Sequence, residues 1–348
     1  MKAPASAADG APPAAARGAG PATPAWQLHV AESGPSGDPA EPRLPLAFAP
    51  FLFLEPAHLA LARPAGPVLS FYLEEPGAGL TVALLHVELN CGEPGRASSP
   101  GQAPFGGVQA TAGLPAAALH QLLDGVEAVL RRRGQRRLHL RGHAFCYDPA
   151  NAARLAEVLR QRRYPVVLAE QNYHLDLRRD FLTHLTYNER HCVRRCQRAG
   201  LVVEQEPPLL LPLAYEFMLQ CRQERGHGPA LPLARVQALF AAFPRQHLLL
   251  SVRTPTGEWA AIGVAIQVSP QVLYEFYVAS PLRFNQLSPA VLLHGGLHAF
   301  AQASGLRVLD LGTSTLPTGP NASLLRFKRH LGGVAGLRLS WEKPLAGG

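Results

Sequence analysis

Two side chains in one apolar segment of the sequence have the chemistry needed for proton transfer. Glu275 and Tyr277 lie in residues 272–279, which are otherwise apolar or aromatic. A carboxylate buried in such a segment has a raised pKa and can accept a proton from an amine, and a phenol can donate one to a carbonyl or a leaving group. In a strand, both side chains would share one face with Leu273. The alternatives are a structural ion pair for Glu275 and a core position for Tyr277.

A second pair of charged residues lies near the end of the chain. Asp310 precedes Gly312 in an apolar segment, and a charge buried there should be paired because burying it alone is costly. Lys328 is its natural partner, or else a ligand contact. Lysine occurs only at positions 2, 328 and 343, whereas arginine supplies almost all the positive charge. An interior lysine in such a chain indicates a site that needs a compact ammonium and not the planar fork of arginine.

Arginines form a third feature. Arg190, Arg194 and Arg198 recur every four residues, so on a helix they make one basic stripe that can bind phosphates between domains. A solvated helix face is the alternative. The formal net charge of +8 permits a polyanionic partner such as tRNA or a nucleotide-linked substrate, although none of the usual nucleic-acid-binding motifs is present.

Several other chemistries receive little support. His294 and His298 have the spacing of metal ligands on a helix, but the glutamate of H-E-x-x-H is missing and Gly295-Gly296 lies between them, so we expect no metal site. The chain has no G-x-S-x-G nucleophile elbow, which argues against a serine hydrolase. Its five cysteines are odd in number and lack C-x-x-C spacing, as expected of reduced thiols in a cytoplasmic protein. No apolar run is long enough to span a bilayer.

The length of 348 residues suits two domains of ordinary size. Residues 1–43 differ from the rest, because Ala, Pro, Gly and Ser dominate there and apolar periodicity is nearly absent. Such a segment cannot bury enough surface to offset its chain entropy, so we expect a disordered tail that can be deleted without loss of stability. The tail also lacks the continuous apolar block of a secretory signal.

The elements that must position the candidate residues occur twice in a similar order. Each half shows strands followed by a helix, a strand, a helix and a strand. The corresponding pairs are the helices at 114–133 and 288–304, the strands at 137–141 and 307–311, and the helices at 149–162 and 321–331. Between the halves, a long helix is predicted over residues 180–199 and is ended by Gly200.

Three motifs carry a resemblance to a known family. They are Pro104-Phe105-Gly106-Gly107, the basic helix 188–199 that runs through Gly200 into Val202-Val203-Glu204, and Leu309-Asp310-Leu311-Gly312 followed by Phe327-Lys328 and Gly332-Gly333. In this order, over about residues 45–343, the chain resembles FemAB-like acyltransferases of the GNAT superfamily. The resemblance implies an α/β fold of tandem GNAT-like domains at 44–178 and 201–348, connected by the basic helix at 179–200. We therefore expect two mixed sheets joined through that helix.

The same resemblance implies roles for particular residues. In GNAT domains the donor enters where the fourth and fifth strands splay apart, which here are residues 272–279 and 307–312. The implied catalytic residues are Glu275, Tyr277, Asp310 and Lys328, the last of which falls on the lysine of the family motif. The implied contacts to substrate or donor are Phe105, Gly106, Arg190, Arg194, Ser288, Gly312 and Arg329.

One departure from the GNAT pattern bears on the donor. Acetyl-CoA-binding domains hold the pyrophosphate on a Q/R-x-x-G-x-G/A loop at a helix N-terminus, but residues 284–290 contain no glycine and Pro289 removes an N–H donor. The resemblance implies transfer of an acyl or aminoacyl group to an amine, with no tightly bound cofactor and with acyl-CoA or another small or carrier-linked thioester as co-substrate. Aminoacyl-tRNA as donor and a catalytically silent GNAT-like scaffold are the alternatives. The sequence leaves the oligomeric state open.

Overall fold

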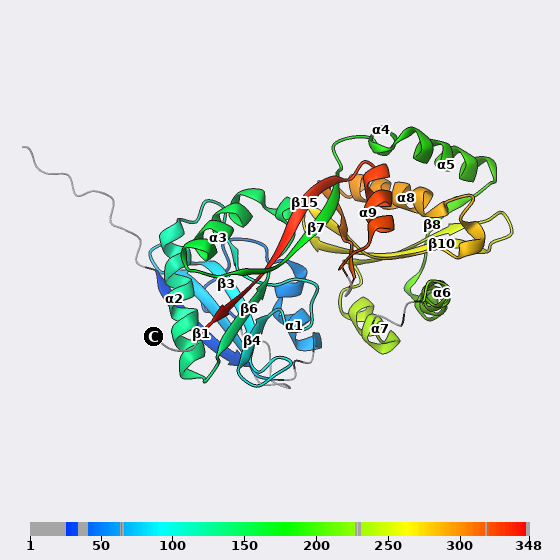
Figure 1. Cartoon of the computed structure of the whole chain (residues 1–348). Helices are drawn as coiled ribbons and strands as arrows, with labels where there is room; N and C mark the ends of the chain where they lie inside the picture. Colours follow the sequence, from blue (N-terminus) through cyan, green and yellow to red (C-terminus); the bar gives the residue numbers. More distant parts are fainter. Residues whose placement is uncertain are drawn as a thin grey trace, which may run out of the picture.

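Two α/β halves lie side by side and share one long mixed sheet (Figure 1). The structure is a computed structural model, and it describes residues 26–345 apart from 34–40, 63, 65, 227, 229–230 and 317–318. Within this part of the chain, no helix is long and apolar enough to cross a membrane. The five cysteines are free thiols, as the sequence predicted.

The first half supplies the elements up to residue 161. It begins with β1 (Gln27–Ser33), the 3-10 turn η1 (Leu52–Leu54), α1 (Pro56–Ala62), β2 (Val68–Glu75), β3 (Leu80–Glu88), β4 (Arg96–Ser99) and β5 (Gln109–Ala110). It continues with α2 (Ala116–Arg132), β6 (Arg137–Arg141), η2 (Phe145–Tyr147) and α3 (Pro149–Gln161).

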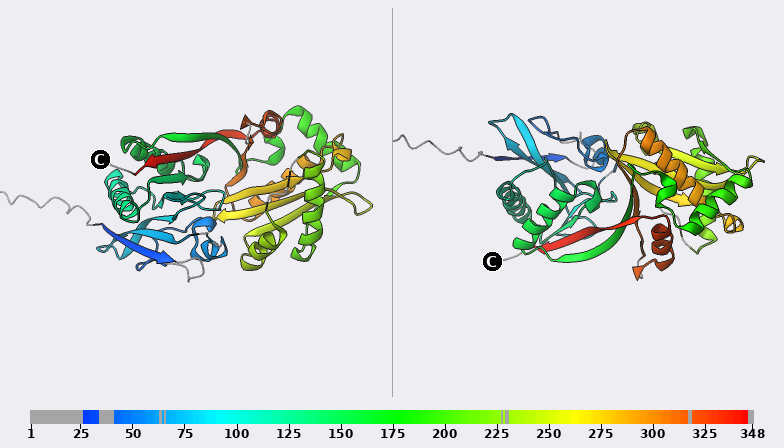
Figure 2. Two further views of the ribbon diagram at one scale, coloured as in Figure 1. Left: turned by 60° about the horizontal axis from the view of Figure 1, so that its bottom comes forward. Right: turned by 90° about the horizontal axis from the view of Figure 1, so that it is seen from above.

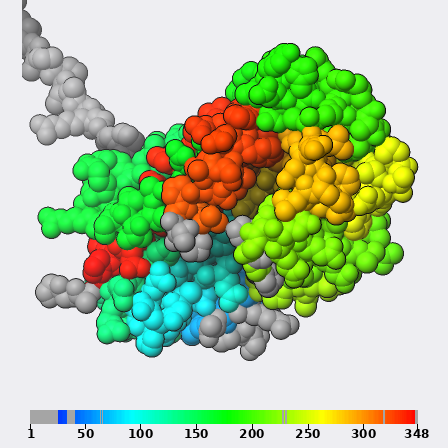
Figure 3. Space-filling view, turned by 45° about the vertical axis from the view of Figure 1, so that its right-hand side comes forward, coloured from blue at the N-terminus to red at the C-terminus, as the bar shows by residue number. Residues whose placement is uncertain are grey.

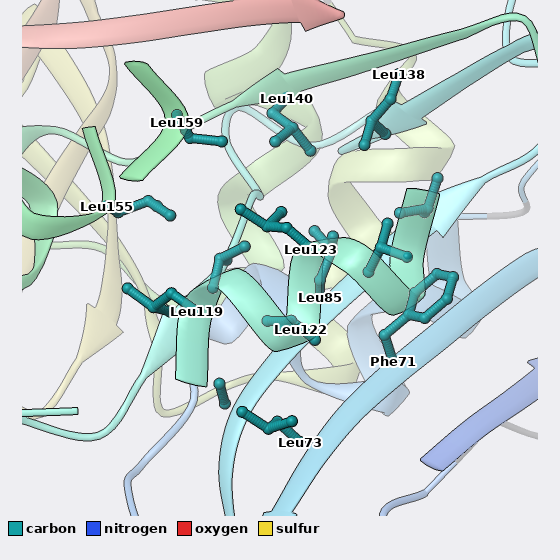
Figure 4. Packing of buried hydrophobic residues seen from close by; sticks show 14 of the residues in the cluster. Phe71, Leu73, Leu85, Leu119, Leu122, Leu123, Leu138, Leu140, Leu155 and Leu159 are labelled. Atoms are coloured by element: carbon teal, nitrogen blue, oxygen red, sulfur yellow. The ribbon is translucent and has the colours of Figure 1, made fainter. Parts of the chain in front are cut away.

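Helix α2 forms the centre of the first core. Its apolar residues recur at helical spacing and are buried against the strands, as Figure 4 shows for Leu119, Leu122 and Leu123 beside Leu85. Helix α3 starts where the sequence predicted, because the side chain of Asp148 accepts the N–H of Asn151 at the first turn.

The second half carries two layers of helices on its part of the sheet. Its elements are α4 (Phe181–His184), α5 (Tyr187–Arg198), β8 (Val202–Gln205), η3 (Pro208–Leu210), α6 (Leu211–Gln223), α7 (Leu233–Ala242), β9 (His247–Arg253), β10 (Trp259–Ser269), β11 (Val272–Ala279), η4 (Leu282–Phe284), α8 (Pro289–Ala303), β12 (Val308–Thr313), the short pair β13 (Thr315–Leu316) and β14 (Gly319–Pro320), and α9 (Ala322–His330). Helices α4, α5, α8 and α9 cover one face, and α6 and α7 cover the other (Figures 1 and 2). Strand β9 alternates accordingly, with Leu248 and Leu250 in the core under α8 and Leu249 in the core under α6.

The last strand of each half completes the sheet of the other half. Strand β7 (Val166–Asp176) follows α3 but pairs with β12, and β15 (Val334–Pro344) follows α9 but pairs with β6. Strands β7 and β15 also pair with each other, so the ladder is continuous across the molecule. The sheet has 13 strands among the described residues, in the order β1-β2-β3-β4-β6-β15-β7-β12-β11-β10-β9-β8 with β5 beside β3.

This exchange corrects the predicted connection between the halves. We expected two separate mixed sheets joined through one helix at 180–199, but a single sheet joins them through β7 and β15. The predicted helix is also interrupted, because Leu185 and Thr186 have extended backbone between α4 and α5. Partners of a strand lie far away in sequence, so element order alone did not reveal the exchange. The predicted boundaries at residues 178 and 201 divide the chain but not the sheet.

The prediction that residues 1–43 form a disordered tail is wrong for residues 27–33. These residues form β1, which pairs antiparallel with β2 over its whole length. Leu28 packs on the first core, and a Cβ at Gly125 of α2 would lie only 2.2 Å from its Cδ2 atom. The strand was missed because it is a single short edge strand surrounded by Ala, Pro and Gly. Residues 1–25 and 34–40 lie outside the described residues.

Candidate active site

Strands β11 and β12 separate part of the way along their length and leave a cavity between them. They pair in parallel only from Val272 opposite Val308 to Tyr274 opposite Asp310. Beyond this point β11 stays with β10, and a cavity of about 590 Å³ opens. Residues from both strands and from α6, α8 and α9 line it, and Figure 3 shows these segments around one depression on the surface. The predicted splay of the fourth and fifth strands is therefore present.

A bulge in β11 separates the two side chains that were predicted to share a face. Ala265 of β10 is opposite Glu275 and Val264 is opposite Tyr277, so Phe276 is an extra residue. Glu275 contacts α8, whereas Tyr277 packs with the residues under α6, on the other face of the sheet. The prediction of a common face is wrong because strict alternation fails at a bulge. Both side chains nevertheless line the cavity.

Glu275 forms a buried ion pair with a histidine that sequence reasoning did not assign. The Nε2 atom of His294 lies 2.7 Å from its carboxylate, and the Nδ1 atom lies 2.6 Å from the carbonyl oxygen of Ala290. A carbonyl can only accept, so Nδ1 carries a proton. Burial is the strongest single influence and lowers the pKa of His294, but the charge and hydrogen bond of Glu275, together with the Ala290 carbonyl, raise it above the ordinary value. The pair can therefore hold and share a proton beside the cavity.

Lys328 projects from α9 into the same cavity and is 2% exposed. Its ammonium donates to the carbonyl oxygens of Gly312 at 3.0 Å and Thr313 at 2.9 Å. Burial lowers its pKa, and the charges of Glu275 and Asp310 oppose that shift. An ammonium has three N–H donors, and the third has no hydrogen-bond partner in the described part of the chain.

Asp310 does not pair with Lys328 as the sequence suggested. No ion pair within 4 Å joins them in the described structure. The Asp310 carboxylate instead accepts hydrogen bonds from the hydroxyl of Tyr147 at 2.5 Å, the amide of Asn172 at 2.8 Å and the backbone N–H of Gly312 at 2.7 Å. Burial raises the pKa of Asp310, and these hydrogen bonds work against that shift.

The Asp310 network connects the first half of the chain to the cavity. Tyr147 lies in η2 and Asn172 lies in β7, so both come from residues before 177. They hold the Asp310 carboxylate that fixes Gly312, which has a left-handed backbone with φ of 72°. The carbonyl of Gly312 then holds Lys328. Asp310 is thus a positioning residue behind the cavity wall, whereas Gly312 lines the cavity.

The other predicted contacts do not line this cavity. Arg190 donates to the carbonyl of Leu185 at 2.9 Å, while Arg194 is exposed on α5 and Arg329 on α9. Ser288 precedes α8, and its backbone N–H donates to Phe284. Phe105 and Gly106 belong to the first half, where Phe105 is buried among aromatic rings. Any role of these six residues in ligand binding remains a prediction.

His294 and His298, the metal pair that the sequence suggested and we rejected, face different surroundings. His298 packs against Phe181 and His184 with ring centroids 5.4 and 5.7 Å away. The described residues contain no group of three potential ligands that could hold a metal ion. His294 pairs instead with Glu275, a carboxylate on the strand that α8 covers. Predicting this pair from the sequence would require knowing which helix covers which strand.

Comparisons with known proteins identify a matching domain and similar folds. Residues 183–329 match the family model described as an acetyltransferase (GNAT) domain. The fold is similar to that of FemX, with a TM-score of 0.60 and 11% identity, over 79% of this chain and 87% of that one. It is also similar to L-PGS from Bacillus licheniformis, with a TM-score of 0.52 and 10% identity, over 75% and 81% of the two chains. No curated protein sequence matches.

A third solved structure is a conserved protein of unknown function from Bacteroides thetaiotaomicron VPI-5482, with a TM-score of 0.55 and 10% identity, over 83% and 90% of the two chains. At such identities the likeness concerns the fold alone. The matched domain and the similar solved structures confirm the predicted mixed α/β GNAT fold and the resemblance to the GNAT superfamily. Residues 183–329 therefore match a GNAT acetyltransferase domain, and all the described residues that line the cavity lie within this matched segment.

Proposed function

We propose, from the GNAT domain at residues 183–329, that this protein transfers an acyl or aminoacyl group to an amine in the cavity between β11 and β12. One observation carries the proposal. The Glu275 carboxylate and the Lys328 ammonium line the same cavity, and each is fixed by buried partners. Acyl transfer needs both a proton acceptor for the amine and a positive group for the carbonyl oxygen.

Glu275 acts as the general base in this scheme. An attacking amine must lose a proton, and Glu275 is the only carboxylate among the described residues that line the cavity. His294 behind it holds the carboxylate in place and shares the proton through the 2.7 Å contact. The contact with His294 fixes the direction of the carboxylate, so the base is positioned before the substrates bind.

Lys328 stabilises the negative charge that develops on the donor carbonyl or on the leaving group. Two of its N–H donors are fixed by Gly312 and Thr313, so the third is oriented without cost at the time of reaction. Its pKa is lowered by burial, which also makes proton donation to a leaving thiolate or alkoxide easier. Tyr277 lines the other face of the cavity and is the second candidate for that proton donation.

We propose an acyl thioester such as acyl-CoA as the donor, bound as a co-substrate, because residues 183–329 match an acetyltransferase domain. Its pyrophosphate would have to bind without the usual loop, because the N–H of Ser288 donates to the carbonyl oxygen of Phe284 and Pro289 has no N–H. Aminoacyl-tRNA is the second candidate donor. The similarity in fold to FemX and the exposed Arg194 favour it.

A donor and acceptor panel tests the proposal. Purified protein is mixed with acyl-CoA, acyl carrier protein or aminoacyl-tRNA and with a set of amines, and products are read by mass spectrometry. We expect transfer by the wild type and a loss of roughly a hundredfold or more in Glu275→Gln, the scale of losing a general base. Glu258→Gln, an exposed substitution of the same type, is the control and should stay active. No transfer from any donor would favour a silent binding protein.

A further inference from the structure

Two arginines, Arg222 in α6 and Arg225 in the turn that follows it, face the cavity from the side opposite to Lys328. Arg222 and Arg225 both line it, and no carboxylate of the described residues lies within 4 Å of either guanidinium. Helix α6 covers the face of the sheet that α8 and α9 do not cover (Figures 1 and 2). The cavity therefore has two ends, a catalytic end at Glu275 and Lys328 and a cationic end at the two arginines.

The arginines are held in place by carbonyl oxygens and by a ring, none of which neutralises charge. The Nε atom of Arg222 donates to the carbonyl of Gly228 at 2.5 Å, and its guanidinium lies 5.5 Å from the ring centroid of Tyr277. The terminal nitrogens of Arg225 donate to the carbonyls of Cys221 at 2.9 Å and Ser280 at 2.7 Å. The Tyr277 side chain also takes a hydrogen bond from Arg222, and no carboxylate of the described residues takes the donors that remain, so these can reach a ligand.

The balance of charge in the cavity is positive. Among the described residues that line it, the cations without a carboxylate partner are Arg222, Arg225 and Lys328, and the one carboxylate, Glu275, is already paired with His294. A concave site with unpaired guanidinium groups attracts a planar or tetrahedral anion, because the arginine fork matches the geometry of carboxylate and phosphate oxygens. A neutral or cationic ligand would leave these charges partly desolvated and without a partner.

From this arrangement we infer that the acceptor is an amine that also carries an anionic group, a carboxylate or a phosphate, which Arg222 and Arg225 bind. The inference rests on the proposed acyl transfer. The amine must reach Glu275 while the acyl carbonyl lies at Lys328, so the remaining part of the acceptor extends toward the α6 end. Amino acids, peptides with a free carboxyl terminus and amino-sugar phosphates share this chemistry.

Matched pairs of amines test the inference by calorimetric binding to the full chain. One pair is alanylalanine and its carboxyl-terminal amide, and the other is glucosamine 6-phosphate and glucosamine. We expect the charged member of at least one pair to bind more tightly, and the pair that responds identifies carboxylate or phosphate as the recognised group. Arg222→Gln should weaken binding of that charged member roughly ten- to a hundredfold, the scale of a hydrogen-bonded charge pair, without affecting the neutral member.

The controls separate a ligand contact from a change in folding. Arg225→Gln removes the second, exposed guanidinium and should act in the same direction with a smaller effect. Arg245→Gln changes the charge equally at an exposed position outside the cavity, and should bind as the wild type does. Where transfer is measured, Arg222→Gln should raise the KM for the acceptor far more than it lowers kcat.

Three outcomes would overturn the inference. The first is equal binding of the charged and neutral members, and the second is wild-type affinity of Arg222→Gln for the charged member. The third is a loss of coenzyme A binding in Arg222→Gln with no loss for the charged amines, which would show that the arginines bind phosphates of the donor. Charge-selective binding without transfer from any donor would overturn the proposed function and leave the anion site. Transfer without charge selection would overturn the anion site and leave the function.

Discussion

The two halves of the molecule contain the same parallel strand pair, but only the second half leaves it open. Strands β4 and β6 pair up to Ser99 opposite Leu140, as β11 and β12 pair up to Tyr274 opposite Asp310. In the first half, the N–H of Gly106 donates to Arg141 at 2.8 Å and the N–H of the next residue donates to the hydroxyl of Ser99 at 3.0 Å. The chain itself therefore bridges the two diverging strands. We call the space between β4 and β6 beyond Ser99 the filled wedge, and the cavity between β11 and β12 beyond Tyr274 the open wedge.

Aromatic side chains fill the wedge in the first half. Phe105 is 2% exposed and packs against Phe51 and Phe53 with ring centroids 5.7 and 4.9 Å away. A cavity of about 30 Å³ remains beside Ser99 and Pro100, against about 590 Å³ in the second half. A duplicated topology can thus keep one site and fill the other. The Pro-Phe-Gly-Gly motif that suggested a ligand contact lies in the filling segment.

The histidines of the two halves differ in the same way. His143, among the rings of the first half, has its pKa lowered to about 4 by burial, and its Nε2 atom has no partner in the described structure. His294, beside the open wedge, has its pKa raised because the charge and hydrogen bond of Glu275, together with the Ala290 carbonyl, outweigh burial. The histidine beside the cavity between β11 and β12 is thus paired with a carboxylate, whereas His143 forms no ion pair with any residue that the structure describes.

The largest expected effect comes from Lys328→Met. If the open wedge is catalytic, turnover should fall roughly a hundredfold, the scale of losing one charge-stabilising group. Met has a similar shape, so the protein should still fold. The Asp310 carboxylate accepts three hydrogen bonds that do not involve Lys328, so Lys328→Met does not leave it without a partner. Adding Asp310→Leu to Lys328→Met should therefore not restore stability. Measurements of turnover and melting temperature on the single and double variants check both expectations. Full activity in Lys328→Met would show that Lys328 does not belong to the catalytic site.

Tyr147→Phe tests whether the first half supports the open wedge. The substitution leaves one oxygen of the buried Asp310 carboxylate without its 2.5 Å donor, and should lower the free energy of unfolding by about 1.5–3 kcal/mol. Because Tyr147 acts through the turn that holds Lys328, kcat should also fall while KM changes little. Tyr187→Phe, at a tyrosine that is 67% exposed, is the matched control. Identical behaviour of the two variants would show that the network is unimportant.

Gly106→Ala tests the filled wedge. A Cβ at this position would lie 2.8 Å from the backbone nitrogen of Pro100, so the bridging segment must shift, at a cost of about 1–3 kcal/mol in stability. Activity per folded molecule should not change if the first wedge is structural. Gly77→Ala, where nothing lies within 4 Å, should be nearly neutral. Lost turnover at full stability in Gly106→Ala would instead support the predicted ligand contact.

The smallest effect concerns the pH dependence of stability. A pKa raised on folding gives His294 a stabilising contribution that is complete below its ordinary value of 6.5 and is lost as pH rises through the raised value. The difference in melting temperature between wild type and His294→Gln should therefore be largest below about pH 6.5 and shrink above it. Other buried histidines, such as His143, titrate equally in both proteins, so the difference isolates His294. A difference that grows with pH would contradict the assigned ion pair.

The sequence predicted most strands and most helices because these depend on local patterns, although it missed β1. The order of these elements and the three motifs then supported the resemblance to the GNAT superfamily. The helix at Asp148 was found from its local pattern, whereas the splay near residues 272 and 307 was implied by the resemblance to GNAT domains. The sequence did not predict the exchange of β7 and β15, since strand partners are non-local. For the same reason it identified Glu275 and Lys328 individually but missed His294.

The bulge at Phe276 reversed the expected direction of Tyr277, because alternation along a strand assumes a regular ladder. The role of Asp310 was also misassigned, since its partners Tyr147 and Asn172 come from distant parts of the chain. Residue types and motifs therefore indicated the chemistry, while the structure was needed to show which groups meet.

Filling the cavity between β11 and β12 shows whether transfer takes place there. Ser323 is an exposed residue that lines the cavity, so Ser323→Trp places an indole inside it without replacing a core side chain. With whichever donor and acceptor the panel identifies, we expect transfer to fall at least roughly tenfold while the melting temperature stays unchanged, because reactants displaced by about 1 Å already lose rate strongly. Ser304→Trp, at the exposed end of α8, should react as the wild type does. Equal rates in the two variants would contradict a reaction in this cavity.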